Sequence, residues 1–182
     1  MRRLNVGAGR NPKDGWTNLD IRAGPGIDVV ADIQTADLTQ FGPFDEIIMS
    51  HLLEHLPNPL DAMQHLYDAA NPDCTLTVVC PHGGSDAAWE DQTHLRAYYP
   101  GSFLAFSQPY YHLADYGYRA DWQITKCLVT ARRQFADNLE YALRHYRNVA
   151  ENMLVTLKAV KPARPVTAPQ SFPKLTVRWI DG

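Results

Sequence analysis

Short apolar runs separated by turn residues fill the first half of the chain. They are rich in β-branched residues and bounded by Gly, Pro, Asn or Asp, which is typical of buried strands. The predicted strands cover residues 4–6, 16–21, 27–31, 44–50 and 75–80. A helix is predicted between the last two, with Asn58 as N-cap, Pro59 in its first turn and Asn71-Pro72-Asp73 at its end. This order predicts an α/β fold: a mostly parallel sheet with flanking helices.

The second half has a different pattern. Residues 83–108 are polar and predict a functional loop with one or two short helices, and residues 122–130 predict a later strand. From residue 132 to about 158 the apolar positions recur at helical spacing, which predicts one long amphipathic helix. Its apolar stripe is Phe135, Leu139, Leu143, Tyr146, Val149, Met153 and Leu157. A proline-rich linker and a terminal strand at 175–180 follow.

The chain is therefore divided into three parts. Residues 1–131 form the core, residues 132–160 the long helix, and residues 161–182 the linker with a strand that completes the sheet. Between Gly9 and Trp16, and between Ile21 and Ile27, there is no room for a crossover helix. These connections are expected to be taut loops that leave one sheet face bare. We expect the 132–160 helix, or a second subunit in a homo-oligomer formed through it, to cover that face.

Charge and composition exclude several functions. The chain of 182 residues has 17 Lys and Arg against 20 Asp and Glu, a net charge of −3. Without a basic stripe, nucleic acid is a poor default partner. The 3 cysteines are too far apart for a zinc spacing or a disulfide framework. No apolar run approaches the ~20 residues that span a bilayer, and Met1-Arg2-Arg3 leads directly into a strand. We expect a cytoplasmic protein without a membrane partner.

Three segments resemble class I S-adenosylmethionine (SAM) dependent methyltransferases, especially the small type 11 group. They are LNVGAGRNPKDGWTNLDI, DVVADI and FDEIIMSHLLEHL, in that order. The resemblance covers roughly residues 4–108 and implies a Rossmann-like sheet, transferase activity and SAM as cofactor. It implies that Gly7 and Gly9 face the methionine part, Asp20 the ribose and Asp32 the adenine. The full set of predicted cofactor residues is Asn5, Gly7, Gly9, Asp20, Ile21, Asp32, Ile33 and Ser50.

The physical chemistry of these positions agrees with the resemblance. Ligands of open parallel sheets bind outside the carboxyl ends of the strands. Gly7 and Gly9 follow the first strand, where their small size lets backbone approach a ligand. Asp20 and Asp32 end the next two, where a carboxylate can accept hydrogen bonds from hydroxyl or amino groups. Each acid could instead be a turn residue. The family often has an acid where this chain has Asn5, so backbone carbonyls are expected to hold the amine of SAM.

The acceptor side is predicted in residues 81–99, which follow the fifth strand to the same edge. His51 and His94 are alternative general bases because imidazole titrates near neutral pH, and Asp91 completes the candidate catalytic set. Arg96 could bind a carboxylate or phosphate through two hydrogen bonds. His82 and Tyr99 are further substrate-binding candidates. Alternatively, Asp91, His94 and Arg96 only order the loop. The predicted acceptor is an unknown small molecule, or a saccharide-like one.

The segment His51-Leu52-Leu53-Glu54-His55 also matches a zinc metallopeptidase pattern. There His51 and His55 would bind metal from one helix face, with Glu54 as general base. Pro57 closes the segment too soon for that helix, so this remains a remote alternative, and no metal ligands are assigned. Glu54 and His55 are expected to hydrogen-bond to nearby backbone. A third hypothesis is a degenerate SAM-binding protein with a structural or regulatory role.

Overall fold

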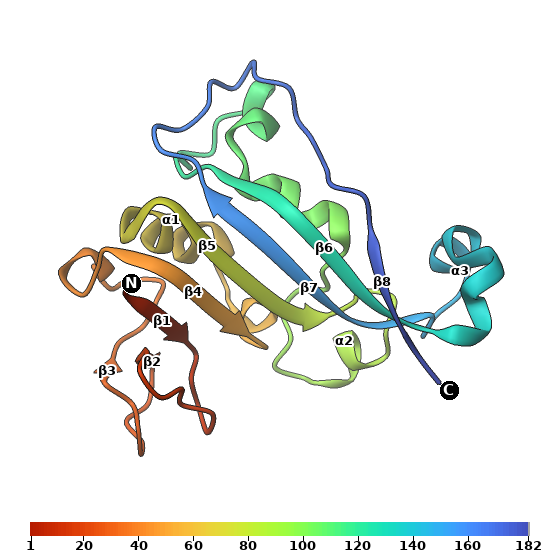
Figure 1. The fold of residues 1–182 in the computed structure, drawn as a ribbon, viewed down its shortest axis with the longest axis horizontal. Helices are drawn as coiled ribbons and strands as arrows, with labels where there is room; N and C mark the ends of the chain where they lie inside the picture. The colour runs from red at the N-terminus through yellow and green to blue at the C-terminus, as the bar shows by residue number, and fades with distance from the viewer. Residues whose placement is uncertain (182) are drawn as a thin grey trace.

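The computed structural model describes residues 1–181 and contains an eight-stranded sheet in the order β3-β2-β1-β4-β5-β7-β6-β8 (Figure 1). Strands β3, β2, β1, β4 and β5 run parallel, β7 is antiparallel to both β5 and β6, and β8 is parallel to β6. The predicted α/β fold is confirmed. The strands are β1 Arg3–Val6, β2 Thr17–Asp20, β3 Val29–Val30, β4 Phe44–Ser50, β5 Ala70–Pro81, β6 Trp122–Arg132, β7 Ala150–Ala159 and β8 Thr176–Ile180.

The helices are short. Helix α1 starts at Pro59 after Asn58, as predicted, and ends at Asp68, before Asn71-Pro72-Asp73, because β5 already begins at Ala70. In residues 1–181, no helix is long and apolar enough to cross a membrane. The α-helices are α1 Pro59–Asp68, α2 Ala87–Glu90 and α3 Leu139–His145. The 3₁₀ helices are η1 Leu38–Gln40, η2 Leu53–His55, η3 Pro100–Phe106, η4 Gln108–His112 and η5 Arg133–Asn138.

The prediction of one long helix from residue 132 to about 158 is wrong. The segment forms η5 and α3, turns at Asn148 with a φ of 56°, and then enters β7. Met153 and Leu157 lie four residues apart, a spacing that one helix face and one strand face share. Their buried partners at 155 and 159 show the two-residue period of a strand. Because β7 lies between β5 and β6, its backbone is inside the sheet and cannot form the predicted oligomerisation helix.

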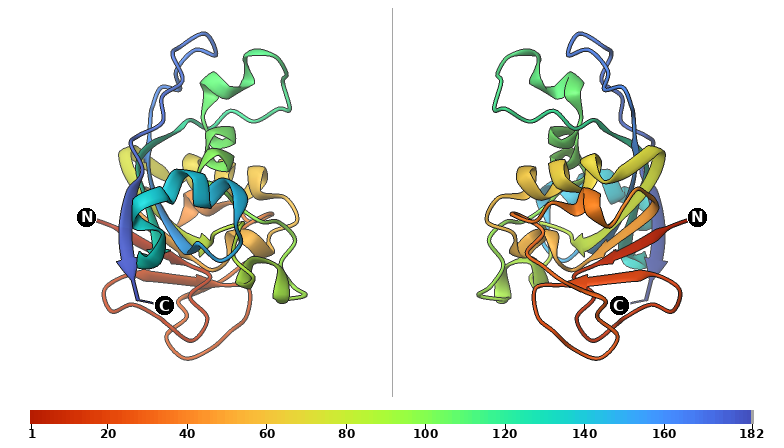
Figure 2. Two further views of the ribbon diagram at one scale, coloured as in Figure 1. Left: turned by 90° about the vertical axis from the view of Figure 1, so that its right-hand side faces the viewer. Right: turned by 90° about the vertical axis from the view of Figure 1, so that its left-hand side faces the viewer.

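The two faces of the sheet differ in cover. Neighbouring residues such as Met49, Val78 and Val155 point to one face and are fully buried. Helix α1 packs on this face, where the Trp122 indole donates a hydrogen bond of 3.0 Å to the Met63 carbonyl. Residues facing the other way are half-exposed: Ile48, Thr77, Val79, Leu154 and Leu128. In Figure 2 the helices gather on one side of the sheet. The predicted helical cover of the bare face is therefore wrong, while cover by a second subunit stays a prediction.

Taut loops make the first two connections, as predicted. Residues 7–16 join β1 to β2, and residues 21–28 join β2 to β3, by turns and extended segments. On the otherwise bare face, the buried Asn5 amide donates to the Asn18 side-chain oxygen at 2.9 Å and to the Asn11 carbonyl at 3.1 Å. Asn18 also accepts from the Lys13 backbone at 2.8 Å. Polar contacts therefore hold the first loop where a crossover helix would otherwise pack.

Candidate active site

A cavity of about 290 Å³ lies outside the carboxyl ends of β1, β2 and β3. This is where ligands of open α/β sheets bind, and its size is close to the lower end for small-molecule sites. The segment after β4 forms its opposite wall. The lining residues are Val6, Gly7, Leu19, Asp20, Ile21, Ala31, Asp32, Ile33, Gln34, Leu52, His55, Leu56 and Pro57.

The turn after β1 needs glycine. Gly7 has a φ of +67°, and a Cβ there would lie 2.9 Å from the Leu52 side chain. The side chain of any other residue would therefore strain the backbone and fill the cavity wall. Gly9 donates its N–H to one Asp20 oxygen at 2.8 Å, and the Arg22 N–H donates to the other at 2.9 Å. The two N–H groups fix the Asp20 carboxylate at the rim, directly beside the turn.

Asp32 lies in the same cavity as Asp20, as the strand order predicts. One Asp32 oxygen accepts from the Gln34 N–H at 2.9 Å, which makes Asp32 a turn residue as well as a cavity residue. Ile33 next to it is buried, with 4% of its surface exposed. The cavity thus presents two carboxylates, which can accept hydrogen bonds from the hydroxyl and amino groups of a nucleoside, and an apolar wall that can pack on the face of its base.

The predicted cofactor residues divide into two groups. Gly7, Asp20, Ile21, Asp32 and Ile33 line the cavity, and Gly9 bonds to Asp20. Asn5 and Ser50 are absent from the residues that line it. The Asn5 side chain bonds within the chain, as described above, and Ser50 is an exposed residue at the end of β4.

The wall after β4 is formed by Leu52, His55, Leu56 and Pro57, which the sequence does not predict as site residues. The segment FDEIIMSHLLEHL resembles the family, but the resemblance does not indicate which of its residues would line a cavity. Pro57 was noted only as a helix breaker. Pro57 follows η2 closely and lines the cavity, so the break that it marks in the sequence was the available signal.

Beyond this wall lies a buried carboxylate. The Glu54 side chain is 2% exposed, and within residues 1–181 neither of its oxygens has a hydrogen-bond partner. The Nδ1 atom of His51 lies 3.3 Å from one of them. His51 itself has a φ of 51°, unusual for a residue with a side chain, at the carboxyl end of β4. The predicted backbone hydrogen bond of the Glu54 side chain is therefore wrong.

The loop at residues 91–94 completes the same cluster. Hydrogen bonds from the Thr93 hydroxyl and N–H lower the pKa of Asp91. The other Asp91 oxygen lies 3.9 Å from His94 Nε2. The His94 and His55 rings meet edge to face at 4.7 Å. The three predicted catalytic residues, His51, His94 and Asp91, therefore surround Glu54 and His55, although they are not adjacent in sequence.

The predicted substrate residues Arg96, His82 and Tyr99 make contacts with other parts of the chain. Arg96 donates to the Leu56 and Pro57 carbonyls at 2.9 and 2.8 Å, so it braces the cavity wall. Burial lowers the pKa of His82 to about 4. Its Nδ1 accepts from the Gly84 N–H at 3.1 Å, and its ring meets that of Tyr99 at 5.2 Å. Tyr99 is 46% exposed, whereas His82 is buried.

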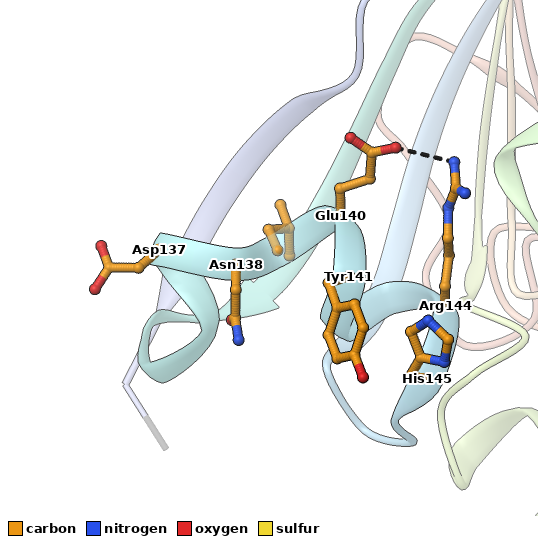
Figure 3. A pocket seen from close by; sticks show the side chains of 7 residues that line it. Asp137, Asn138, Glu140, Tyr141, Arg144 and His145 are labelled. Atoms are coloured by element: carbon orange, nitrogen blue, oxygen red, sulfur yellow. Dashed lines mark hydrogen bonds and ion pairs between the residues drawn. The ribbon is translucent and has the colours of Figure 1, made fainter.

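A larger cavity of about 460 Å³ surrounds α3 (Figure 3). Its walls carry a Glu140–Arg144 ion pair at 2.9 Å and the Tyr141 and His145 side chains. The glycine turn, the rim carboxylates and the Glu54 cluster are not among its lining residues. Although this cavity is larger, it has none of the residues predicted for the site, so the smaller cavity at the strand ends is the candidate active site.

Comparisons with known proteins identify the class. The sequence model of a family described as a methyltransferase domain matches residues 9–117, more than half of the chain. No curated protein sequence matches. A SAM-dependent methyltransferase from Archaeoglobus fulgidus superposes with a TM-score of 0.57 at 19% identity, covering 87% of this chain and 86% of that one.

Two other solved structures are similar in fold. StiE O-MT superposes with a TM-score of 0.60 at 9% identity, covering 97% of this chain and 75% of its own. A 16S rRNA (adenine(1408)-N(1))-methyltransferase from Catenulisporales acidiphilia gives a TM-score of 0.53 at 14% identity, over 90% of this chain and 88% of that one. The fold is thus that of the class I SAM-dependent methyltransferases, as the sequence predicts. The chain belongs to the methyltransferase-domain family, whose class uses SAM as methyl donor.

Proposed function

We propose that the protein binds SAM in the cavity at the strand ends and transfers its methyl group to a small molecule. The observation that carries this is the meeting of Gly7, Asp20 and Asp32 in one cavity, drawn from three successive strands. Asp20 would accept hydrogen bonds from the ribose hydroxyls, and Asp32 from the adenine amino group. The apolar wall at Ile33 and Leu56 would pack on the base.

The acceptor would lie beside the Glu54 cluster, which borders the cavity through His55. When bound, SAM supplies an electrophilic methyl group. The residues of the chain must then hold the acceptor in line and take its proton, and such positioning supplies much of the rate. His51 is suited to accept that proton because it is accessible. The Glu54 carboxylate 3.3 Å from its Nδ1 would orient the ring.

The acceptor is proposed to be a small hydroxylated molecule. The net charge of −3 gives no electrostatic attraction to a polyanion. A panel of hydroxylated small molecules, saccharides and an RNA oligonucleotide, assayed for S-adenosylhomocysteine release, tests this. Methylation of RNA alone would contradict it. Cofactor binding without turnover on any member would favour the degenerate SAM-binding hypothesis.

Calorimetric titration with SAM and S-adenosylhomocysteine tests the cofactor site directly. Gly7→Ala should weaken both by at least about tenfold, because the new methyl group meets Leu52. Gly101→Ala is the matched control, since a Cβ at Gly101 has nothing within 4 Å. Failure of the unmodified protein to bind either compound, or equal binding by the two glycine variants, would refute the site.

A further inference from the structure

Burying an ionised carboxylate without a partner is costly, so such a group usually marks an absent ligand or a functional role. Glu54 is close to this case: its side chain is 2% exposed, its two oxygens accept no hydrogen bond within residues 1–181, and the His51 ring lies 3.3 Å from one of them. A ligand atom from each of Glu54, His55 and His94 lies within 4.8 Å of the other two. Two imidazoles and a carboxylate are a typical ligand set for zinc and neighbouring divalent transition metals.

The hydrogen bonds of the two imidazoles leave the correct nitrogen free. The Thr93 hydroxyl donates to Asp91 at 2.6 Å, so both Thr93 oxygens near His55 Nδ1, at 3.0 and 3.2 Å, can only accept from it. His94 Nδ1 faces the Ala88 carbonyl at 3.2 Å and must also donate. Each ring therefore carries its proton on Nδ1 and exposes the lone pair of Nε2. Histidine ligands of metals are normally held in this way.

From these contacts we infer that Glu54 and the Nε2 atoms of His55 and His94 bind one zinc-class divalent metal ion beside the cofactor cavity. Tetrahedral ligand atoms about 2.1 Å from zinc lie roughly 3.4 Å apart, so small side-chain rotations suffice to close the cluster. The zinc-peptidase alternative in the sequence paired His51 with His55. The left-handed turn at His51 and the short η2 remove the helix face that this pairing needs.

The site also refines the catalytic assignment, and this part rests on the proposed function. A metal bound to His94 Nε2 leaves that nitrogen without a lone pair for proton transfer. Of the two predicted bases, only His51 would then be able to accept a proton from the acceptor. Its ring would be oriented by one oxygen of the same Glu54 carboxylate.

The test is zinc binding by the full chain after chelator treatment and dialysis, measured by competition with a chromophoric chelator. We expect one equivalent of Zn²⁺ to bind, and Co²⁺ to give a visible absorption band, whereas Mg²⁺ should not compete. Glu54→Gln and His94→Ala should each weaken zinc at least about tenfold, while His51→Ala and the exposed-site control His145→Ala should not. Thr93→Val should weaken zinc less severely, by releasing His55.

Circular dichroism and SAM calorimetry on the same variants separate folding and cofactor binding from metal binding. A Glu54→Gln protein that is folded and binds SAM but has lost zinc supports the site. Absence of zinc binding in the unmodified chain would overturn it. Zinc affinity that depends on His51 and not on His94 would overturn it as well. Since none of these readouts requires methyl transfer, the metal site can fail while the proposed function stands.

Discussion

Two buried carboxylates, at opposite ends of the sheet, have opposite surroundings. Asp121 precedes β6 with none of its side chain exposed, and Arg164 donates to its two oxygens at 2.8 Å each. Burial raises the pKa of Asp121, but the Arg164 hydrogen bonds and charge outweigh this and lower it overall. Glu54 is almost as deeply buried, but its oxygens accept no hydrogen bond within residues 1–181, and its neighbours are the imidazoles of His51, His55 and His94. A satisfied charge fixes the fold, whereas an unsatisfied one is available to a ligand.

The largest expected effect is at Asp121. Arg164→Met should lower the free energy of unfolding by about 3–5 kcal/mol, because it leaves a buried charge without its partner. Urea denaturation measures it. The exposed ion pair of Asp115 and Arg119 is the control, and Arg119→Ala should leave the midpoint unchanged. Equal effects of the two arginine substitutions would remove the distinction between a fixed charge and a surface pair.

Acid should destabilise the fold through a third buried group, His82. Burial lowers the pKa of this imidazole to about 4. Above about pH 6.5 its ring is neutral in folded and unfolded chains, so it has no effect on stability there. Between about pH 6.5 and 4 only the unfolded chain takes up the proton, and stability should fall by up to about 1.4 kcal/mol per pH unit. Denaturation curves across this range should lose most of that slope in His82→Gln. An unchanged slope would contradict the pKa.

Replacing each of the two carboxylates by its amide is expected to change the free energy of unfolding least, and in different directions at the two sites. Asp121→Asn should lower the free energy of unfolding by about 2 kcal/mol, since charge-assisted hydrogen bonds to Arg164 are lost. In metal-free protein, Glu54→Gln should leave it equal or raise it by up to about 1 kcal/mol, since an uncompensated charge is removed. Thermal melts with chelator present measure both. A large loss at Glu54 would mean that its pairing with His51 already stabilises the fold.

The sequence predicts the parts of the molecule that are fixed locally. Helix α1 and strands β1, β2 and β4 follow from their periodicity and turn residues, and the shared edge of parallel strands brings Asp20 and Asp32 together. The helix proposed for residues 132–158 fails because apolar residues four apart fit a strand as well as a helix. Only the pairing of β7 with β5 and β6, which is not local, decides between them.

The candidate site was predicted less completely for the same reason. The sequence indicates Asp91, His94 and His51 as candidates, but their arrangement around Glu54 depends on tertiary contacts. The Leu95 N–H donates to the Glu54 carbonyl at 2.8 Å, which brings two loops together across some forty residues of sequence. No local pattern in either loop specifies that contact.

The amide pair of Asn5 and Asn18 has a consequence for the opposite side of the sheet. Asn18 also bonds to Asp28 through its backbone and side chain, at 2.7 and 3.2 Å, so one residue anchors both short loops. The glycine turn that would receive the methionine portion of the donor is thereby anchored from behind. Asn5, Asn18 and Asp28 do not line the cavity, so substitutions at these positions would change the glycine turn only through the backbone.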